Sequence, residues 1–303
     1  MGNNDYCSKK NPLISIITPS FNQGEFIEDT ICSILDQDYP NIQLIIIDGG
    51  SSDGTIEILK KYSNSIEFIS EPDNGQVDAI LKGFKMARGE IITWLNSDDV
   101  YIFKDTLSKV FSFFQTDPQI DIISGSTVLI DSENKFLQVY RAFPKFNYKQ
   151  LLIYDFIRQP ATFFKSYLLK NNDNDLDRNL HCAFDYDLWL RLSVNHKLCM
   201  VRDVLAGIRR HSEMKTIRLA SLMDEESEIV QKRYKNMISI SIFEKFKGLV
   251  LRATNKVLGL FLAFEIYKFI KKNNNNKLAI SIATDGLVRI FLRQLLNHKK
   301  ILF

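Results

Sequence analysis

Two adjacent carboxylates near residue 98 could hold a divalent cation. Asp98 and Asp99 come directly after Trp94-Leu95-Asn96-Ser97, at the end of an apolar stretch. Carboxylates this close repel each other by roughly 1 to 4 kcal/mol at water-like to surface-like dielectric. A hard cation such as Mg²⁺ or Mn²⁺ relieves that repulsion and leaves positions open for phosphate oxygens. The alternative is that one of the two caps a helix predicted from Lys104.

Two further acidic residues stand at the ends of apolar segments. Asp48 precedes Gly49-Gly50, where the backbone can come close to a ligand, and its carboxylate can accept from a base N–H or a ribose hydroxyl. Asp185 begins a predicted helix, whose free N–H groups keep a carboxylate ionised. The neighbouring Tyr186 and Trp189 are candidates for an acceptor sugar site. The sequence favours equally the alternative that Asp185 is only a charge at a helix terminus and that Asp187 and Arg191 form an exposed ion pair.

The elements that position these residues alternate between strand and helix. Apolar runs predict strands at 13–18, 42–47, 66–69 and 91–95, and amphipathic patterns predict helices at 25–35, 55–62 and 77–87. This alternation indicates an α/β fold, with a mostly parallel sheet covered on both faces. Ligands bind such sheets at the carboxyl ends of the strands, which is where Asp48 and Asp98 lie.

The pattern is looser in the second half of the chain. We expect a helix at 104–114, a strand at 120–130, an aromatic-rich stretch at 140–164 and a loop at 171–179. Further helices are expected at 185–195 and 221–236, and an amphipathic segment at about 243–270.

Composition limits the classes of protein to consider. The 303 residues are 45% hydrophobic and 25% charged, as in a globular chain. From residue 235 onward thirteen Lys and Arg stand against three acids, a net +10, so the remainder carries −7. The acidic body argues against nucleic-acid binding, whereas the basic tail suits an anionic surface.

The compartment expected from the sequence is a reducing cytoplasm. The four cysteines are far apart and have no metal-site spacing. The first ten residues lack the apolar core of a signal peptide, and the longest uncharged apolar stretch of the tail, 257–264, is far below the roughly 20 residues that a spanning helix needs.

Six segments together resemble the family 2 glycosyltransferases with the GT-A fold, closest to the branch that decorates bacterial surface polysaccharides. The likeness covers about residues 13–215 and departs at Phe184, where relatives often carry Glu, and at Leu81, where they often carry Asn. The matching segments are Ser15 to Gly24, Ile47 to Thr55, Ser70 to Gly75, Trp94 to Asp99, Gln159 to Phe164 and Asp185 to Arg191.

The resemblance implies roles for individual residues. Asp185 would be the catalytic base, Asp99 the direct metal ligand, and Asp98 a contact to the ribose or the metal. His211 matches a family segment that can approach the diphosphate or its metal, although an exposed histidine among basic residues explains it as well. The residues that would hold the nucleoside and close its pocket are Pro19, Ser20, Phe21, Asn22, Asp48, Asp73 and Gly75.

The implied activity is an inverting, metal-dependent transfer of one sugar from a nucleotide-diphosphate sugar, with uridine diphosphate as the default. The acceptor would be a hydroxyl of a glycan or lipid-linked glycan in surface polysaccharide synthesis. The Gln-x-x-Arg-Trp motif of processive relatives is absent from the sequence. A dehydrogenase would need G-x-G-x-x-G after the first strand, which is also absent. The alternative kept open is a catalytically silent scaffold that binds sugar nucleotides in a polysaccharide assembly complex.

The expected organisation is a GT-A domain at 1–240, followed by a basic amphipathic helical region at 241–303. The domain would have a nucleotide-binding half at about 12–100 and an acceptor-binding half at about 101–240. Two readings of the tail remain equal: an interfacial helix on anionic lipid, or a helical cap on the core or on a homodimer. The expected location is therefore the cytoplasm, with peripheral contact to the inner face of the membrane.

Overall fold

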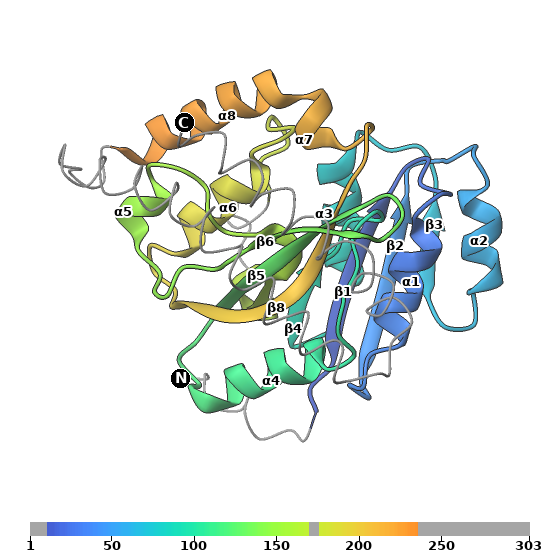
Figure 1. Ribbon diagram of the computed structural model, residues 1–303, viewed down its shortest axis with the longest axis horizontal. Coiled ribbons are helices and arrows are strands. Elements are labelled where there is room, and N and C mark those ends of the chain that lie inside the picture. Colours follow the sequence, from blue (N-terminus) through green and yellow to red (C-terminus); the bar gives the residue numbers. More distant parts are fainter. Residues whose placement is uncertain (1–10, 170–175, 236–303) are drawn as a thin grey trace, which may run out of the picture.

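A mixed, mostly parallel sheet runs through the part of the chain that the computed structural model describes, residues 11–169 and 176–235 (Figure 1). Its eight strands have the order β3-β2-β1-β4-β7-β5-β6, and β8 pairs with β5. The strands are β1 (Ile14–Ser20), β2 (Ile42–Asp48), β3 (Glu67–Ser70), β4 (Ile91–Trp94), β5 (Ile122–Asp131), β6 (Phe136–Tyr140), β7 (Thr162–Lys165) and β8 (Leu198–Arg210).

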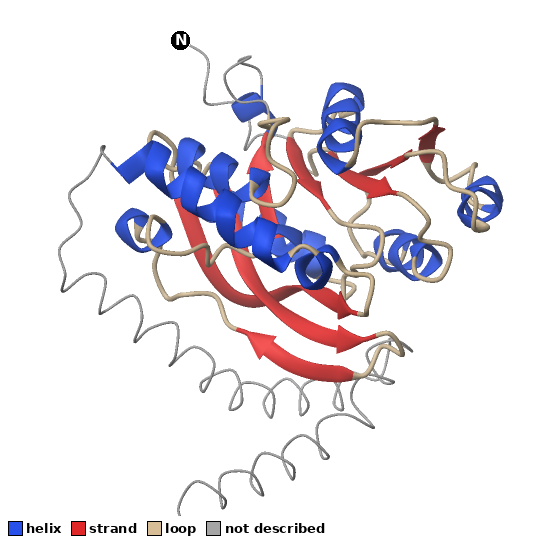
Figure 2. Cartoon of the chain, turned by 90° about the horizontal axis from the view of Figure 1, so that it is seen from above, coloured by secondary structure: helices blue, strands red, loops and turns tan. Residues whose placement is uncertain are grey.

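Helices cover both faces of this sheet (Figure 2). On β1, Ile14 and Ile16 pack with α1 and α4, whereas Ile17 packs with α3 and α6 on the opposite face, as the alternation of side chains along a strand requires. The α-helices are α1 (Ile27–Leu35), α2 (Thr55–Lys61), α3 (Gln76–Met86), α4 (Thr106–Thr116), α5 (Tyr148–Leu151), α6 (Phe184–Leu192), α7 (Lys215–Arg218) and α8 (Ala220–Tyr234), and two short 3₁₀ helices are η1 (Gln159–Ala161) and η2 (Ser166–Leu169).

The first half confirms the predicted strand–helix alternation. β1 pairs in parallel with β2 on one side and β4 on the other, and every residue of β1 is buried. Helix α3 lies close to the sheet at Gly83, where an added Cβ would come within 2.3 Å of Ile17. A larger side chain would collide with Ile17, so glycine at this position lets α3 pack directly against β1.

The second half contains strands that the sequence analysis missed. β7 runs antiparallel between β4 and β5, inside the stretch predicted only as aromatic-rich. β8 is 13 residues long and pairs in parallel with β5, and their register shifts near Ser124 and Ser126. Arg202 and Asp203 interrupt the apolar alternation of β8, which is why its sequence does not read as a strand.

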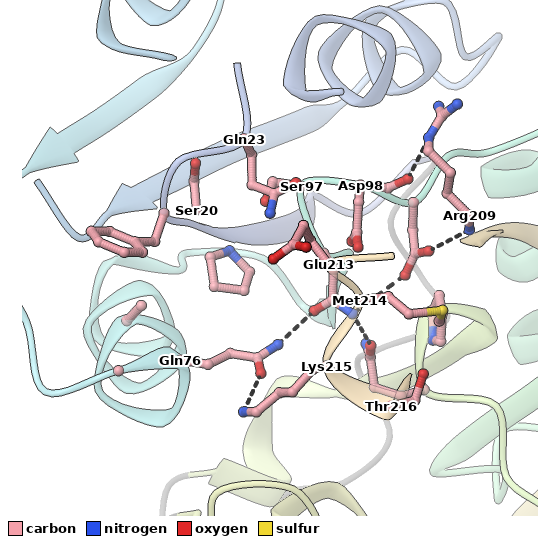
Figure 3. Close-up of a pocket in the computed structure, with 18 of the residues that line it drawn as sticks. Ser20, Gln23, Gln76, Ser97, Asp98, Arg209, Glu213, Met214, Lys215 and Thr216 are labelled. Carbon is pink, nitrogen blue, oxygen red and sulfur yellow. Dashed lines mark hydrogen bonds between the residues drawn. The ribbon is translucent and has the colours of Figure 1, made fainter. Parts of the chain in front are cut away.

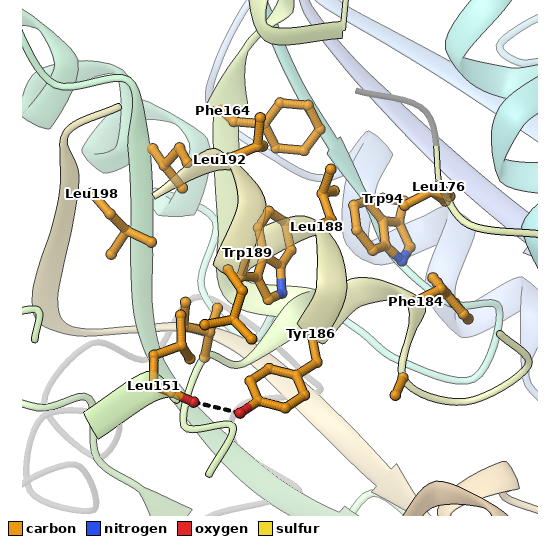
Figure 4. Close-up of a cluster of buried hydrophobic side chains, with 14 of the residues drawn as sticks. Trp94, Leu151, Phe164, Leu176, Phe184, Tyr186, Leu188, Trp189, Leu192 and Leu198 are labelled. Carbon is orange, nitrogen blue, oxygen red and sulfur yellow. Dashed lines mark hydrogen bonds between the residues drawn. The ribbon is translucent and has the colours of Figure 1, made fainter. Parts of the chain in front are cut away.

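An aromatic cluster joins α6 to the sheet (Figure 4). The rings of Trp94 and Trp189 stack with centroids 5.5 Å apart and planes 11° apart, and both side chains are buried. Tyr186 is also buried and donates its hydroxyl hydrogen bond to the carbonyl of Leu151. This packing holds the helix that begins next to Asp185 against the end of β4.

The structure describes only part of the predicted C-terminal organisation. The domain boundary expected at 240 and the basic region 241–303 lie outside the described residues, as does the expected membrane contact of that region. Within 11–169 and 176–235, no helix combines the length and apolar character needed to cross a bilayer.

Candidate active site

A pocket of about 580 Å³ opens at the carboxyl ends of β1, β2 and β4 (Figure 3). Asp98 and Asp99, which follow β4, and Asp185, which opens α6, all line it. The predicted site residues that line this pocket are Pro19, Ser20, Phe21, Asp73, Gly75, Asp98, Asp99 and Asp185. The lining residues that the sequence analysis did not single out include Gln23, Gln76, Asn96, Gln159, Glu213, Met214 and Lys215.

The segment after β1 forms one wall of the pocket. Phe21 exposes 60% of its surface there, and the buried hydroxyl of Ser20 has no hydrogen-bond partner in the described part of the chain. Asn22 does not line the pocket. Its backbone N–H donates to Ser51 Oγ and its Oδ1 accepts from Ser52 N, so it ties two loops together.

Asp48 does not line the pocket either, and its predicted contact with the nucleoside stays a prediction. The residue is fully buried, and Oδ2 accepts from Gly50 N at 3.1 Å, Ser51 N at 2.9 Å and Ser70 Oγ at 2.7 Å. Oδ1 accepts from Ser51 Oγ at 2.5 Å. Because these bonds occupy the carboxylate, Asp48 shapes the glycine loop beside the pocket.

Asp98 lies next to a histidine from the far end of β8. His211 Nε2 is 2.9 Å from Asp98 Oδ2, and the imidazole packs against the ring of Phe26 at 4.7 Å. A carboxylate and an imidazole side by side are donors that suit Mn²⁺ and similar cations. Among the described residues no group of three or more His, Cys, Asp or Glu side chains is arranged to hold a metal. Asp98 and His211 are two such donor side chains that lie together beside the pocket.

Asp99 is the more enclosed of the two adjacent carboxylates. It is 3% exposed, and its oxygens accept from Arg209 N at 3.1 Å and Asn96 Nδ2 at 3.3 Å. Burial, together with the charge of Asp98, raises the pKa of Asp99 well above its ordinary value. Asp98, and not Asp99, is the carboxylate next to His211. That Asp99 is the direct metal ligand stays a prediction.

Asp185 occupies the first turn of α6, facing the pocket. Its Oδ1 accepts from Tyr186 N at 2.8 Å, and burial raises its pKa to about 6. Asp155, which the sequence analysis missed, is an electrostatic neighbour of Asp185. Burial first and the charge of Asp185 second raise the pKa of Asp155 to about 8. The pocket thus contains a carboxyl group able to exchange a proton near neutral pH.

A chain of polar contacts crosses the pocket (Figure 3). Lys215 Nζ donates to Gln76 Oε1 at 2.9 Å, and Gln76 Nε2 donates to Asn96 Oδ1 at 2.9 Å. Burial lowers the pKa of Lys215. Asn96 belongs to the same motif as Asp98. Its place in that motif was the feature of the sequence from which these contacts could have been predicted.

Tyr186 and Trp189 are core residues, and the acceptor contacts predicted for them stay a prediction. Trp189 is fully enclosed against Trp94, and the hydroxyl of Tyr186 is satisfied by the backbone of Leu151. Neither lines the pocket. Asp187 does pair with Arg191, at 3.7 Å, but it is buried and also accepts from Arg233 and Tyr234, so the pair is not the exposed one that was considered.

Comparison with known proteins adds independent information. The family model described as "Glycosyl transferase family 2" matches residues 15–184. A Bacillus subtilis glycosyltransferase named for teichuronic acid biosynthesis is 42% identical over 106 residues, which cover 34% of this chain and 42% of that protein.

Solved structures share the fold. The crystal structure of S. aureus TarS 1-349 in complex with UDP-GlcNAc matches with a TM-score of 0.57 and 18% identity, covering 92% of this chain and 72% of that one. A mannosyltransferase from Pyrobaculum calidifontis, in complex with GDP-Man and Mn²⁺, matches with a TM-score of 0.53 and 17% identity, covering 92% and 88%.

Proposed function

Because the chain belongs to glycosyl transferase family 2, we propose that it transfers one sugar from a nucleotide-diphosphate donor to an acceptor hydroxyl with inversion of the anomeric configuration. The observation that carries this proposal is that Asp98 and Asp185 line one pocket. A single displacement needs a group that removes the acceptor proton and a second region that accommodates the departing diphosphate.

Asp185 supplies the base in this proposal. Its carboxylate takes the proton of the acceptor hydroxyl while the hydroxyl oxygen forms a bond to the anomeric carbon. The bond between that carbon and the diphosphate oxygen breaks, and its electron pair leaves with the nucleotide diphosphate. A pKa of about 6 suits this role, because the carboxylate is ionised at neutral pH yet basic enough to hold a proton.

Asp98 and His211 would hold a divalent cation, since a carboxylate and an imidazole lie 2.9 Å apart beside the pocket. When bound, such a cation neutralises the charge that develops on the diphosphate. The P. calidifontis mannosyltransferase, which shares the fold and is in complex with Mn²⁺, supports a divalent cation in the proposal but not the choice of these two residues. Lys215 contributes a second positive charge to the same pocket.

The proposed nucleotide and acceptor are based on proteins that this chain resembles. The structure of TarS with UDP-GlcNAc supports a uridine donor, and the teichuronic acid relative supports an acceptor in surface polysaccharide synthesis. In this assignment the exposed ring of Phe21 contacts the uracil of the nucleotide, and Asp73 and Gly75 lie beside its ribose. Transfer of one sugar per encounter fits the absence of Gln-x-x-Arg-Trp from the sequence.

The deciding experiment is release of nucleotide from a panel of UDP- and GDP-sugars, with Mn²⁺, with Mg²⁺ and with EDTA. We expect release from at least one donor, and its loss in EDTA. Nucleotide binding without release from any donor would replace this proposal with the silent scaffold.

A further inference from the structure

Glu226 of α8 holds the backbone that leads into the helix of Asp185. Its carboxylate is 4% exposed and accepts from three consecutive N–H groups: those of His181 at 2.8 Å, Cys182 at 2.7 Å and Ala183 at 2.9 Å. Helix α6 begins at Phe184, and its N-cap residue Ala183 provides no side-chain cap. A carboxylate from a distant helix therefore holds the backbone of the three residues that lead into α6.

These bonds are strong for a physical reason. The three N–H groups belong to consecutive residues just before α6, and their dipoles, together with the positive end of the helix dipole, favour an anion. Burial opposes ionisation of Glu226, yet the N–H groups of His181, Ala183 and Cys182 together lower its pKa below the ordinary value. Glu226 is thus a carboxylate at neutral pH, and its bonds to the backbone are charge-assisted.

A second contact fixes α8 to α6. The buried carboxylate of Asp187 accepts from Arg233 Nη1 at 3.2 Å and from Tyr234 OH at 3.1 Å. Asp185 therefore lies between two places where α8 is hydrogen-bonded to the same segment, one at residues 181–183 and one at Asp187. The α8 residues that make these bonds, Glu226, Arg233 and Tyr234, lie beyond residue 184, where the family match ends.

We propose that Glu226 is a positioning residue for sugar transfer, which holds residues 181–183 so that Asp185 faces the pocket. The inference rests on the proposed function, in which Asp185 is the base. It assigns Glu226 no contact with substrate.

Loss of Glu226 should change the base in a definite direction. The charged and titratable groups that act on Asp185 are Asp155, Lys215 and the thiol of Cys182, and Glu226 itself acts on Lys215. Replacing Glu226 by Gln withdraws a negative charge and leaves one side-chain oxygen to accept from the three N–H groups. Both effects favour the ionised form of Asp185, so its pKa falls.

The test compares Glu226→Gln with the matched control Glu228→Gln in the full chain. Glu228 lies on the same helix, is 70% exposed and pairs with Lys232. Nucleotide release is followed with Mn²⁺ from pH 5 to 9, using whichever of UDP-GlcNAc, UDP-glucose or GDP-mannose the wild type turns over. For Glu226→Gln we expect kcat to fall about tenfold, equivalent to about 1.4 kcal/mol. The donor KM should be nearly unchanged, and the acidic limb of the pH profile should move to lower pH.

Glu228→Gln should behave as wild type. A Glu226→Gln enzyme with the wild-type kcat and acidic limb would overturn the inference. A smaller amount of folded, active Glu226→Gln enzyme, with the acidic limb of its pH profile unchanged, would assign Glu226 a structural role only.

Two further measurements keep the inference testable if Glu226→Gln folds poorly. Glu226→Asp retains the charge, so it should keep the wild-type acidic limb while losing part of kcat. Hydrogen exchange at the amides of 181–183 should be faster in Glu226→Gln than in wild type, while β1 stays protected. Unchanged exchange at 181–183 would contradict the claim that Glu226 holds this backbone, even if no donor is turned over. A wild-type enzyme that is inactive on every donor would instead refute the proposed function itself.

Discussion

Nε2 of His211 lies 2.9 Å from Oδ2 of Asp98, although 113 positions separate them in the chain. β8 makes this possible because it runs parallel to β5 and delivers its final residues to the edge of the sheet where β4 ends. The backbone of Gly207 is hydrogen-bonded to Val100, which brings the end of β8 against the segment that carries Asp98. The pairing turns two residues of separate segments into one candidate cation site.

Removing either member of this pair should weaken metal activation. For His211→Ala or Asp98→Ala we expect the Mn²⁺ concentration that gives half-maximal nucleotide release to rise by about tenfold or more, since even outer-shell changes cost 10–100-fold. A manganese titration of each variant measures this. His196→Ala is the control, because His196 contacts Asp121 outside the pocket. Equal manganese dependence in all three variants would remove His211 and Asp98 from the site.

Asp185→Asn should abolish transfer while leaving the nucleotide in place. An amide cannot accept the acceptor proton, so we expect kcat to fall about 10²–10⁴-fold, the usual contribution of a general base. UDP affinity, measured by calorimetry, should stay close to wild type. A parallel loss of affinity and rate would instead assign Asp185 to substrate binding.

The rate should depend on the ionisation of Asp185. Burial raises its pKa to about 6, and the base works only when deprotonated. kcat should therefore rise with pH through about 6, falling about tenfold per unit below it, and level off above it. A pH profile of kcat at saturating donor checks this, and a rate independent of pH between 5 and 7 would contradict it.

Asp155 should make the folded protein less stable as pH rises. Its pKa is raised from the ordinary 3.8 to about 8, so the folded chain keeps a proton that the unfolded chain releases. That contribution to stability is present below pH 3.8 and is lost as pH rises toward 8.

Asp155→Asn should reduce the fall in Tm between pH 5 and pH 8 by roughly ten degrees, because each pH unit in this range is worth about 1.4 kcal/mol and about 1 kcal/mol corresponds to roughly 2–4 °C in a domain of this size. Thermal unfolding at both pH values measures the difference. Asp203→Asn serves as a control away from the pocket. An identical fall in wild type and Asp155→Asn would mean that Asp155 does not titrate in this range.

Trp189 should matter for stability and not for acceptor recognition. Because it is fully buried and stacked on Trp94, Trp189→Ala should reduce the free energy of unfolding by about 3–5 kcal/mol. Trp189→Phe keeps most of the volume, so it should unfold at a higher urea concentration than Trp189→Ala and retain the wild-type acceptor KM. A Trp189→Phe enzyme that is stable but has a greatly raised acceptor KM would restore the predicted acceptor role.

Lys215 should contribute to donor binding. A charge-assisted hydrogen bond is worth about 1.5–3 kcal/mol, so Lys215→Gln should raise the donor KM roughly ten- to a hundredfold. Lys232→Gln, on the exposed face of α8, is the matched control and should leave the KM unchanged. Equal KM values for the two variants would place the diphosphate away from Lys215.

Much of the fold could be read from the sequence because its signals are local. The isoleucine-rich runs at 13–18 and 42–47 and the helical pattern at 77–87 correspond to β1, β2 and α3 within a few residues. The order of polar residues after apolar strands also indicated which edge of the sheet carries the site, and Asp98, Asp99 and Asp185 do line one pocket.

Tertiary structure decided what those residues can reach. A hydrophobic pattern reports how one segment is buried, but not which distant segment lies opposite. The sequence could not show that the Asp48 carboxylate is hydrogen-bonded within its own loop, that Trp189 stacks on Trp94, or that Glu226 of α8 holds the backbone just before α6. Each depends on two segments packing side by side. The chemical groups were therefore evident in the sequence, whereas their accessibility and partners arose only when the chain folded.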